Sequence, residues 1–167
     1  MSPEKQKLVE LAKTGKCLFH GSGDNLEILE PRQAHNIINR EKMPDGEPAI
    51  FASPSIDYAI LMAIINDKNC PKNYSGIRAR AGGVGSEKNT GLYKFKFGVN
   101  KKAMERLTDN SSGWVYVFDK SLFKQRHAGE YISYKPVSPL EKIHVKKQDL
   151  PEDIEIFEDW DYNSKKA

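Results

Sequence analysis

Apolar residues recur at helical spacing in two segments of the chain. Ser2-Pro3 is typical of a helix N-cap followed by a first-turn proline, and apolar residues then share one face until Gly15 ends the pattern. We therefore predict a lysine-rich N-terminal helix over residues 1–15, and a second, buried helix that begins at a cap formed by Ser53-Pro54. The apolar stripe of this second helix consists of Ile56, Ala59, Ile60, Ala63 and Ile64.

Short apolar or alternating runs predict several strands in the rest of the chain. The run that ends at His20 is expected to break at Gly21-Ser22-Gly23, and residues 32–47 and 66–90 show little periodicity and are predicted as irregular loops. The strands gather in the C-terminal half and the two long helices in the N-terminal half, an order that favours an α+β fold over alternating βαβ units. The predicted strands cover residues 17–20, 49–52, 92–97, 114–118, 130–134 and 142–145, with a short helix over 102–107 and a turn over 119–123.

Length, composition and charge narrow the class of protein. A chain of 167 residues with 38% hydrophobic content fits one domain with its own core, spanning residues 1–167. The net charge of +3 permits an anionic ligand such as a dinucleotide but does not require nucleic acid. Residues 152–167 combine acidic side chains with Phe157 and Trp160, and we expect a C-terminal tail that docks its aromatic rings.

Cysteine and histidine are too few and too dispersed for a disulfide framework or a metal centre. The two cysteines, Cys17 and Cys70, do not make the framework of a small secreted domain, and none of the four histidines forms a ligand-like pair, so we predict no metal. The N-terminus lacks the apolar segment of a signal peptide, and no run approaches the roughly 18 apolar residues of a membrane span. We therefore expect a soluble, cytoplasmic protein without a membrane partner.

Glu130 is an ionisable residue that heads a predicted strand. Alternation puts it on one face with Ile132 and Tyr134, while Tyr131 and Ser133 lie on the other face. If the Glu130 face is buried, the carboxylate is desolvated and needs compensation, and such a placement is often functional. If that face is exposed, Glu130 is an ordinary strand-edge glutamate in water. Strand register is not fixed by the sequence, so both alternatives stay open.

Three segments, in chain order, carry a recognisable combination of residues. Leu18-Phe19-His20-Gly21-Ser22 ends a predicted strand, Ile50-Phe51-Ala52-Ser53 joins a strand to the buried helix, and Gly129-Glu130-Tyr131-Ile132-Ser133-Tyr134 begins a strand with a carboxylate. Their order and spacing across residues 17–135 resemble the ADP-ribosyltransferase superfamily, in particular the catalytic domains of poly(ADP-ribose) polymerases. In that family the segments read approximately Trp-His-Gly-Ser, Tyr-Phe-Ala-Asp and Asn-Glu-Tyr-Ile-Val-Tyr. The resemblance implies a split β-sheet or sandwich with an N-terminal helix and one buried helix.

The resemblance also implies an activity and a site. The enzyme would use NAD to transfer one ADP-ribose to a protein or nucleic-acid acceptor, with release of nicotinamide. His20 would bind the adenosine-side ribose, and the Gly21 backbone, next to Ser22, would hold the nicotinamide amide. Glu130 would be catalytic, because it would bind the 2′-hydroxyl of the nicotinamide ribose and stabilise the oxocarbenium-like transition state. Transfer to arginine is disfavoured, since position 128 is Ala where arginine-directed toxins have the first glutamate of Glu-x-Glu.

The chain departs from the family pattern at the tyrosine that stacks on nicotinamide, which falls on Ile50. Phe51 or Tyr58 is the candidate replacement, and the alternative is that Phe51 is a core residue and Tyr58 a helix-packing residue. Ser53 and Ser55 are candidates for the serine that contacts the nicotinamide amide. Ile50 also motivates an alternative function, a non-catalytic nucleotide- or ADP-ribose-binding module. An RNA 2′-phosphotransferase-like enzyme is a further alternative, but it needs paired histidines and arginines that we do not find.

Two further segments are expected near this site. The glycine-rich residues 76–90 are predicted to lie over the mouth of the cleft, with Arg78 and Arg80 near the pyrophosphate or an anionic acceptor, unless they form an ordinary surface loop. His127, in the basic segment before Glu130, either contacts phosphate or acceptor or is simply solvated. The transferase hypothesis requires His20 and Glu130 to line one pocket, and their placement on opposite faces of the domain would exclude it.

Overall fold

The structure is a computed structural model, and it describes residues 1–39, 41–70, 79–86, 94–127 and 129–158. Across these residues three α-helices accompany several small and mostly antiparallel sheets, so the arrangement is α+β, as the order of the elements predicted. In this part of the chain no helix is long and apolar enough to cross a membrane.

Each helix begins at a side-chain cap. The Ser2 hydroxyl accepts a hydrogen bond from the backbone N–H of Lys5 at 3.1 Å, as the sequence predicted. The buried helix starts later than expected, because its cap is Ser55, which accepts from the N–H of Tyr58 at 3.1 Å. The predicted cap at Ser53-Pro54 is wrong, since the Ser53 backbone is paired with a strand instead. The helices are α1 (Pro3–Lys13), α2 (Ile56–Ile64) and α3 (Lys101–Arg106).

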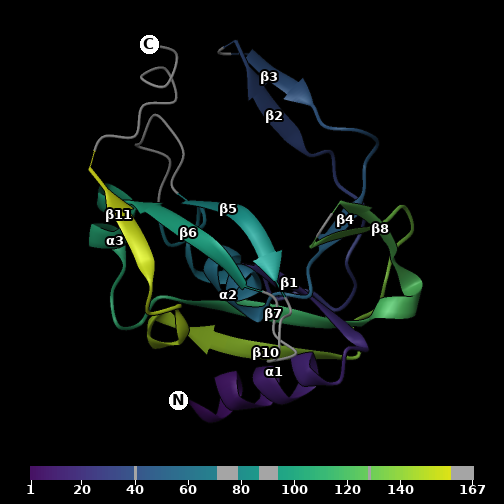
Figure 1. Cartoon of the computed structure of the whole chain (residues 1–167), viewed down its shortest axis with the longest axis horizontal. Helices are drawn as coiled ribbons and strands as arrows, with labels where there is room; N and C mark the ends of the chain where they lie inside the picture. The colour runs from purple at the N-terminus through teal and green to yellow at the C-terminus, as the bar shows by residue number, and fades with distance from the viewer. Residues whose placement is uncertain (40, 71–78, 87–93, 128, 159–167) are drawn as a thin grey trace.

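Three antiparallel strands form the central sheet, in the order β1-β7-β10. One face carries Phe19, Val115 and Val117, which pack with α1 and α2 in the larger hydrophobic core. The opposite face carries Leu18 and Tyr116, which belong to a second, smaller core. Figure 1 shows β7 and β10 running across the molecule, with α1 along one side of this sheet. The strands are β1 (Cys17–Ser22), β7 (Ser112–Asp119) and β10 (Glu141–Lys146).

Two glycines allow α2 to lie directly on this sheet. The predicted break at Gly21-Ser22-Gly23 is wrong, because β1 stays paired with β7 up to Ser22. A Cβ atom on Gly21 would lie 1.8 Å from the carbonyl oxygen of Ala59 in α2, and a Cβ on Gly113 of β7 would lie 1.9 Å from that of Ala63. The helix backbone therefore occupies the space that side chains would otherwise fill.

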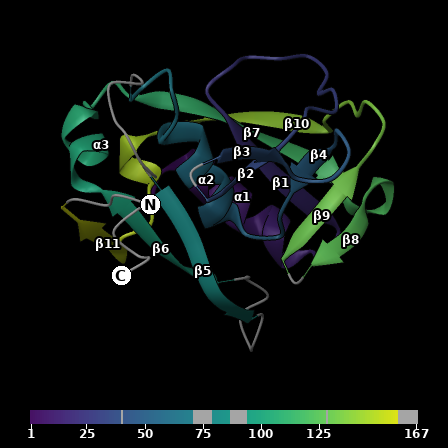
Figure 2. The same ribbon diagram turned by 90° about the horizontal axis from the view of Figure 1, so that it is seen from above.

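A second three-stranded sheet, in the order β4-β9-β8, stands beside the first. It is joined to β1 by one bridge, in which Phe19 and Ser53 exchange backbone hydrogen bonds of 2.8 and 2.9 Å. Strand β8 lies in the basic segment before Glu130, where the sequence indicated no strand. Figure 2 shows β4, β9 and β8 on the opposite side of the molecule from α3 and β11. The strands are β4 (Ile50–Ala52), β8 (Lys124–His127) and β9 (Glu130–Ser133).

The remaining strands correct three loop predictions. Residues 32–47 are not irregular, because β2 and β3 pair as an antiparallel hairpin, which rises away from the other elements in Figure 1. Strand β5 lies within the predicted loop 66–90, and β11 in the predicted tail pairs in parallel with β6. Trp160 lies outside the described residues. The remaining bounds are β2 (His35–Ile38), β3 (Glu41–Pro44), β5 (Ala79–Ser86), β6 (Lys94–Asn100), β11 (Ile154–Phe157) and two 3-10 turns, Lys120–Leu122 and Lys147–Asp149.

The contact between α2 and β7 predicts a position where one methyl group is costly. Gly113→Ala is expected to lower the free energy of unfolding by about 2–3 kcal/mol, because its Cβ meets backbone rather than a movable side chain. Gly15→Ala is the control: its Cβ meets nothing within 4 Å, and only the positive φ of 68° costs about 1 kcal/mol. Urea unfolding of both variants measures the difference, and equal losses would contradict the close helix–sheet contact.

Candidate active site

A cavity of about 1030 Å³ lies beside the bridge between the two sheets. The bridge is antiparallel, so beyond it His20–Ser22 of β1 lie alongside β4, but β1 pairs with β7 and β4 pairs with β9 instead of with each other. The volume is sufficient for a ligand larger than most drug-sized molecules, whose pockets measure about 300–1,000 Å³. Residues from all three motif segments line the cavity, namely His20, Gly21, Ser22, Phe51, Ser53, Tyr58 and Glu130. His20 and Glu130 thus line one pocket, which is the arrangement that the transferase hypothesis requires.

His20 is fixed by a hydrogen bond from its ring to the second sheet. Its Nδ1 lies 2.6 Å from the carbonyl oxygen of Phe51, so Nδ1 carries the proton and donates it, and Nε2 is left as an acceptor. Burial lowers the pKa of His20 below its usual 6.5; the hydrogen bond to Phe51 acts in the opposite direction, and the positive charge of Arg32 lowers the pKa further. The imidazole is therefore neutral at pH 7.

Gly21 has a structural role that is independent of any ligand. Its backbone lines the cavity, but its lack of a side chain is required by the approach of α2 whatever the cavity holds. The neighbouring Ser22 closes the turn after β1, since its hydroxyl accepts a hydrogen bond from the N–H of Asp24 at 3.0 Å. Packing alone therefore explains why the His-Gly-Ser segment has a glycine at position 21. Support for a ligand site in this segment comes from His20 instead.

Phe51 and Tyr58 both reach the cavity, whereas Ile50 belongs to the second core. Ile50 is 3% exposed and borders only a smaller neighbouring cavity of about 150 Å³. Phe51 is half-buried, with the guanidinium carbon of Arg126 at 5.7 Å from its ring centroid. Burial raises the pKa of Tyr58, and the negative charge of Glu130 raises it further. Tyr58 therefore lies within electrostatic reach of Glu130 and stays a neutral phenol.

The two candidate serines have different environments. Ser53 borders the cavity, and its hydroxyl accepts a hydrogen bond from the N–H of Ser55 at 3.1 Å. Ser55 is fully buried, caps α2 and is not among the residues that line the cavity. Of these two serines, Ser53 is therefore the one placed to contact a bound ligand.

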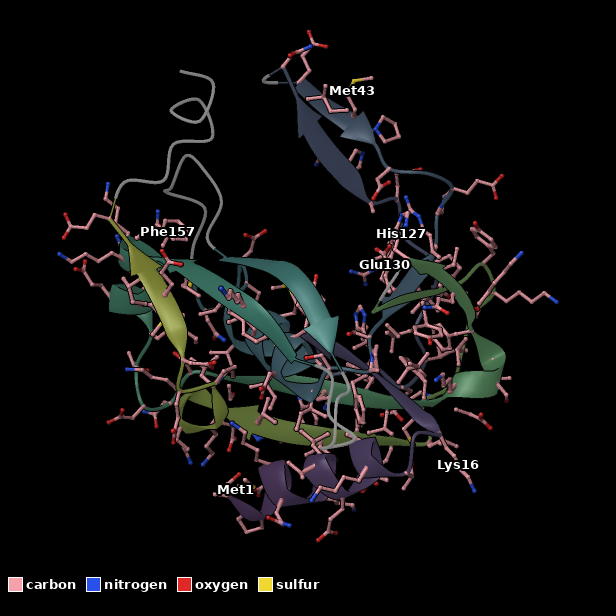
Figure 3. The ribbon with its side chains drawn as sticks, in the orientation of Figure 1. Met1, Lys16, Met43, His127, Glu130 and Phe157 are labelled. Carbon is pink, nitrogen blue, oxygen red and sulfur yellow. The ribbon has the colours of Figure 1, made fainter. Side chains whose placement is uncertain are left out.

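Glu130 is neither buried in the core nor free in water. Its side chain is 34% exposed, and its Oε2 lies 3.8 Å from the Nε2 of His127. Figure 3 shows these two side chains next to one another, at the end of the hairpin formed by β8 and β9. The structure therefore lies between the two alternatives left open by the sequence: the carboxylate is half covered by protein, at the rim of a cavity.

Several polar residues of the cavity were not identified from the sequence. Asp45 lines the cavity and accepts a hydrogen bond at 2.6 Å from Arg126, which joins β8 to the end of the β2–β3 hairpin and raises the pKa of Arg126. This contact depends on a hairpin that was predicted as irregular loop, so no local pattern indicated it. The other charged or polar lining residues that the sequence did not indicate are Asp24, Asn66, Asp67 and Lys68, whereas His127, which it did indicate, also lines the cavity.

Part of the sequence prediction for this site lies beyond what the structure describes. Arg78 and residues 87–90 are outside the described residues, and residues 79–86 form β5 with nothing described for the Arg80 side chain. The placement of segment 76–90 over the cavity therefore stays a prediction. Among the described residues, no three His, Cys, Asp or Glu side chains gather as metal ligands.

Comparisons with models of protein families, with curated proteins and with solved structures return no match to this chain.

The partly buried, neutral His20 predicts acid-sensitive stability. The free energy of unfolding is expected to fall as the pH drops below 6.5, because the unfolded chain then binds a proton that the native imidazole binds only at lower pH. Below the lowered pKa of the native imidazole both states bind the proton, so the free energy of unfolding falls no further through this group. In His20→Gln this contribution is absent, so the stability difference between wild type and variant narrows on acidification. Urea unfolding between pH 7.5 and 5 measures it, with exposed His35→Gln as the control that keeps the wild-type dependence.

Proposed function

We propose that the chain is an NAD-dependent mono-ADP-ribosyltransferase, which cleaves the bond between nicotinamide and ribose and transfers ADP-ribose to a macromolecular acceptor. The observation that carries this proposal is the position of His20 and Glu130 on one cavity, together with the aromatic rings of Phe51 and Tyr58. These residues are distant in sequence, and the resemblance to ADP-ribosyltransferases requires them in one place. Two small sheets that share a single bridge also agree with the split sheet that the resemblance implies.

The chemistry of the proposed reaction suits the surroundings of Glu130. Cleavage of the glycosidic bond leaves positive charge on the ribose, and a fixed carboxylate stabilises that state more than the ground state. Glu130 is held at the start of β9 and is only partly solvated, so its charge acts at short range on a bound ribose. Tyr58, as a neutral aromatic ring beside it, offers a face on which nicotinamide can stack.

The distribution of charge around the cavity agrees with the two ends of NAD. The positive Arg32 acts on His20 and borders the neighbouring cavity of about 150 Å³, which shares His20 and Phe51 with the larger one. The negative Glu130 lies beside Tyr58. NAD has a cationic pyridinium ring and an anionic pyrophosphate, so the proposal orients nicotinamide toward Glu130 and the adenosine side toward His20 and Arg32.

Incubation with labelled NAD and a cell lysate tests this function. We expect release of nicotinamide and incorporation of label into macromolecules, and protease or nuclease treatment then identifies the acceptor class. Binding of NAD without release of nicotinamide would instead support the non-catalytic binding module, and absence of binding would refute both functions.

Glu130→Gln is expected to bind NAD as wild type does but to release nicotinamide about 10²–10³-fold more slowly, because the amide has a similar shape without the charge. Nicotinamide release and calorimetric NAD affinity are the two measurements. Glu155→Gln, at an exposed position on β11, is the matched control and is expected to behave as wild type. Unchanged turnover in Glu130→Gln would remove Glu130 from the catalytic role.

His20→Ala is expected to raise KM for NAD more than it lowers kcat. Its proposed contact is with the ribose remote from the reacting bond, and binding energy that is lost equally in ground and transition states appears in KM. Steady-state kinetics and calorimetry measure the two effects. Wild-type affinity in the variant would show that His20 does not bind NAD.

A further inference from the structure

His127 is placed beside Glu130 by the backbone of a hairpin. The two residues are opposite one another where β8 ends and β9 begins, and the turn between them contains Gly129 with φ 74°. Side chains at opposed positions of an antiparallel pair have Cβ atoms about 4.5–5.5 Å apart, so their proximity follows from the strand register. The register of the pair shifts between Gln125 and His127, as at a β-bulge, and bulges are over-represented next to active sites.

The exposure of these side chains sets their order from the interior to the solvent. Tyr58 lies at the inner end of the group, where burial raises its pKa. The Glu130 side chain is 34% exposed and that of His127 is 67% exposed, and all three line the same cavity. A macromolecular acceptor approaches from the solvent, so it passes His127 before it reaches a ribose held at Glu130.

We propose that His127 is the general base that takes the proton of the incoming acceptor, and that the acceptor group is a neutral hydroxyl. The inference rests on the proposed function. In the step, the bond between ribose C1′ and the nicotinamide nitrogen breaks and its electron pair stays with neutral nicotinamide. The hydroxyl oxygen forms the new bond to C1′, and its proton passes to a ring nitrogen of His127. No further reactant is needed for the balance.

The distance and the charges around His127 suit this step. A separation of 3.8 Å from the Glu130 carboxylate is longer than a hydrogen bond, so an oxygen at about 2.8 Å from Nε2 can still lie next to the carboxylate. The imidazolium that forms is then stabilised by Glu130. Arg126 does not oppose it, since its guanidinium is paired with Asp45, and Tyr58 is neutral.

The role of a base argues for a hydroxyl over a carboxylate as the acceptor group. A carboxylate carries no proton for His127 to remove, whereas a neutral hydroxyl brings the proton that the imidazole accepts.

The test compares protic and anionic nucleophiles in His127→Ala. With NAD, we expect wild type to release nicotinamide in water and to form the methyl glycoside of ADP-ribose when methanol is added. His127→Ala is expected to lose both reactions by about 10²-fold or more, with unchanged NAD affinity. Azide, which attacks without releasing a proton, is expected to restore nicotinamide release in the variant and to form the glycosyl azide. His144→Ala, at an exposed position on β10, is the control with wild-type rates.

Each outcome separates the inference from the function on which it rests. If wild type releases no nicotinamide with any nucleophile, the proposed function fails. If wild type is active and His127→Ala retains methanolysis, the base is not His127. If the variant is slow and azide does not restore it, the loss is structural and the inference is wrong. His127→Gln, which preserves polarity and bulk, is expected to show the same azide response as His127→Ala.

Discussion

The backbone of α2 lies so close to β1 and β7 that neither Gly21 nor Gly113 can carry a side chain. Small residues on the helix, Ala59 and Ala63, form the other half of this contact. Close approach of helix and sheet excludes water and places Ile60 and Ile64 in the larger core. It also fixes the N-terminus of α2, and with it Tyr58, at a defined depth beside the end of β1. The geometry of the candidate site therefore depends on two glycines, one of which lies within it.

The separation of the two sheets creates the cavity. A continuous sheet would pair β4 with β1 along its whole length and leave no opening at His20. Here the pairing is limited to the antiparallel Phe19–Ser53 bridge, beyond which β1 pairs with β7 and β4 pairs with β9. The backbone groups left by this divergence find other partners: the Phe51 carbonyl accepts from the His20 ring. The imidazole thus joins the sheets where backbone pairing ends.

Local patterns predicted much of this fold, and long-range contacts account for most of what they missed. The two long helices and most strands follow from periodicity and capping residues, because those signals are local. The end of β1 was misplaced, since glycine ordinarily disfavours a strand and only the approach of α2 explains Gly21. Strands β3 and β8 consist of exposed or half-buried and mostly polar residues that carry no hydrophobic alternation. His20 and Glu130 were identified as candidates, but Asp45 and Arg126 were not, because their pairing exists only after the hairpins have formed.

The departure from the family motif at Ile50 does not remove the aromatic surface from the cavity. On a strand as short as β4, Ile50 and Phe51 point to opposite faces, so one enters the second core and the other borders the cavity. Tyr58 then supplies a ring from α2, next to the carboxylate of Glu130. Burial and the negative charge of Glu130 both raise the pKa of the Tyr58 phenol. Tyr58 therefore adds no second negative charge at neutral pH. The site therefore places the partly exposed carboxylate of Glu130 beside an uncharged aromatic ring.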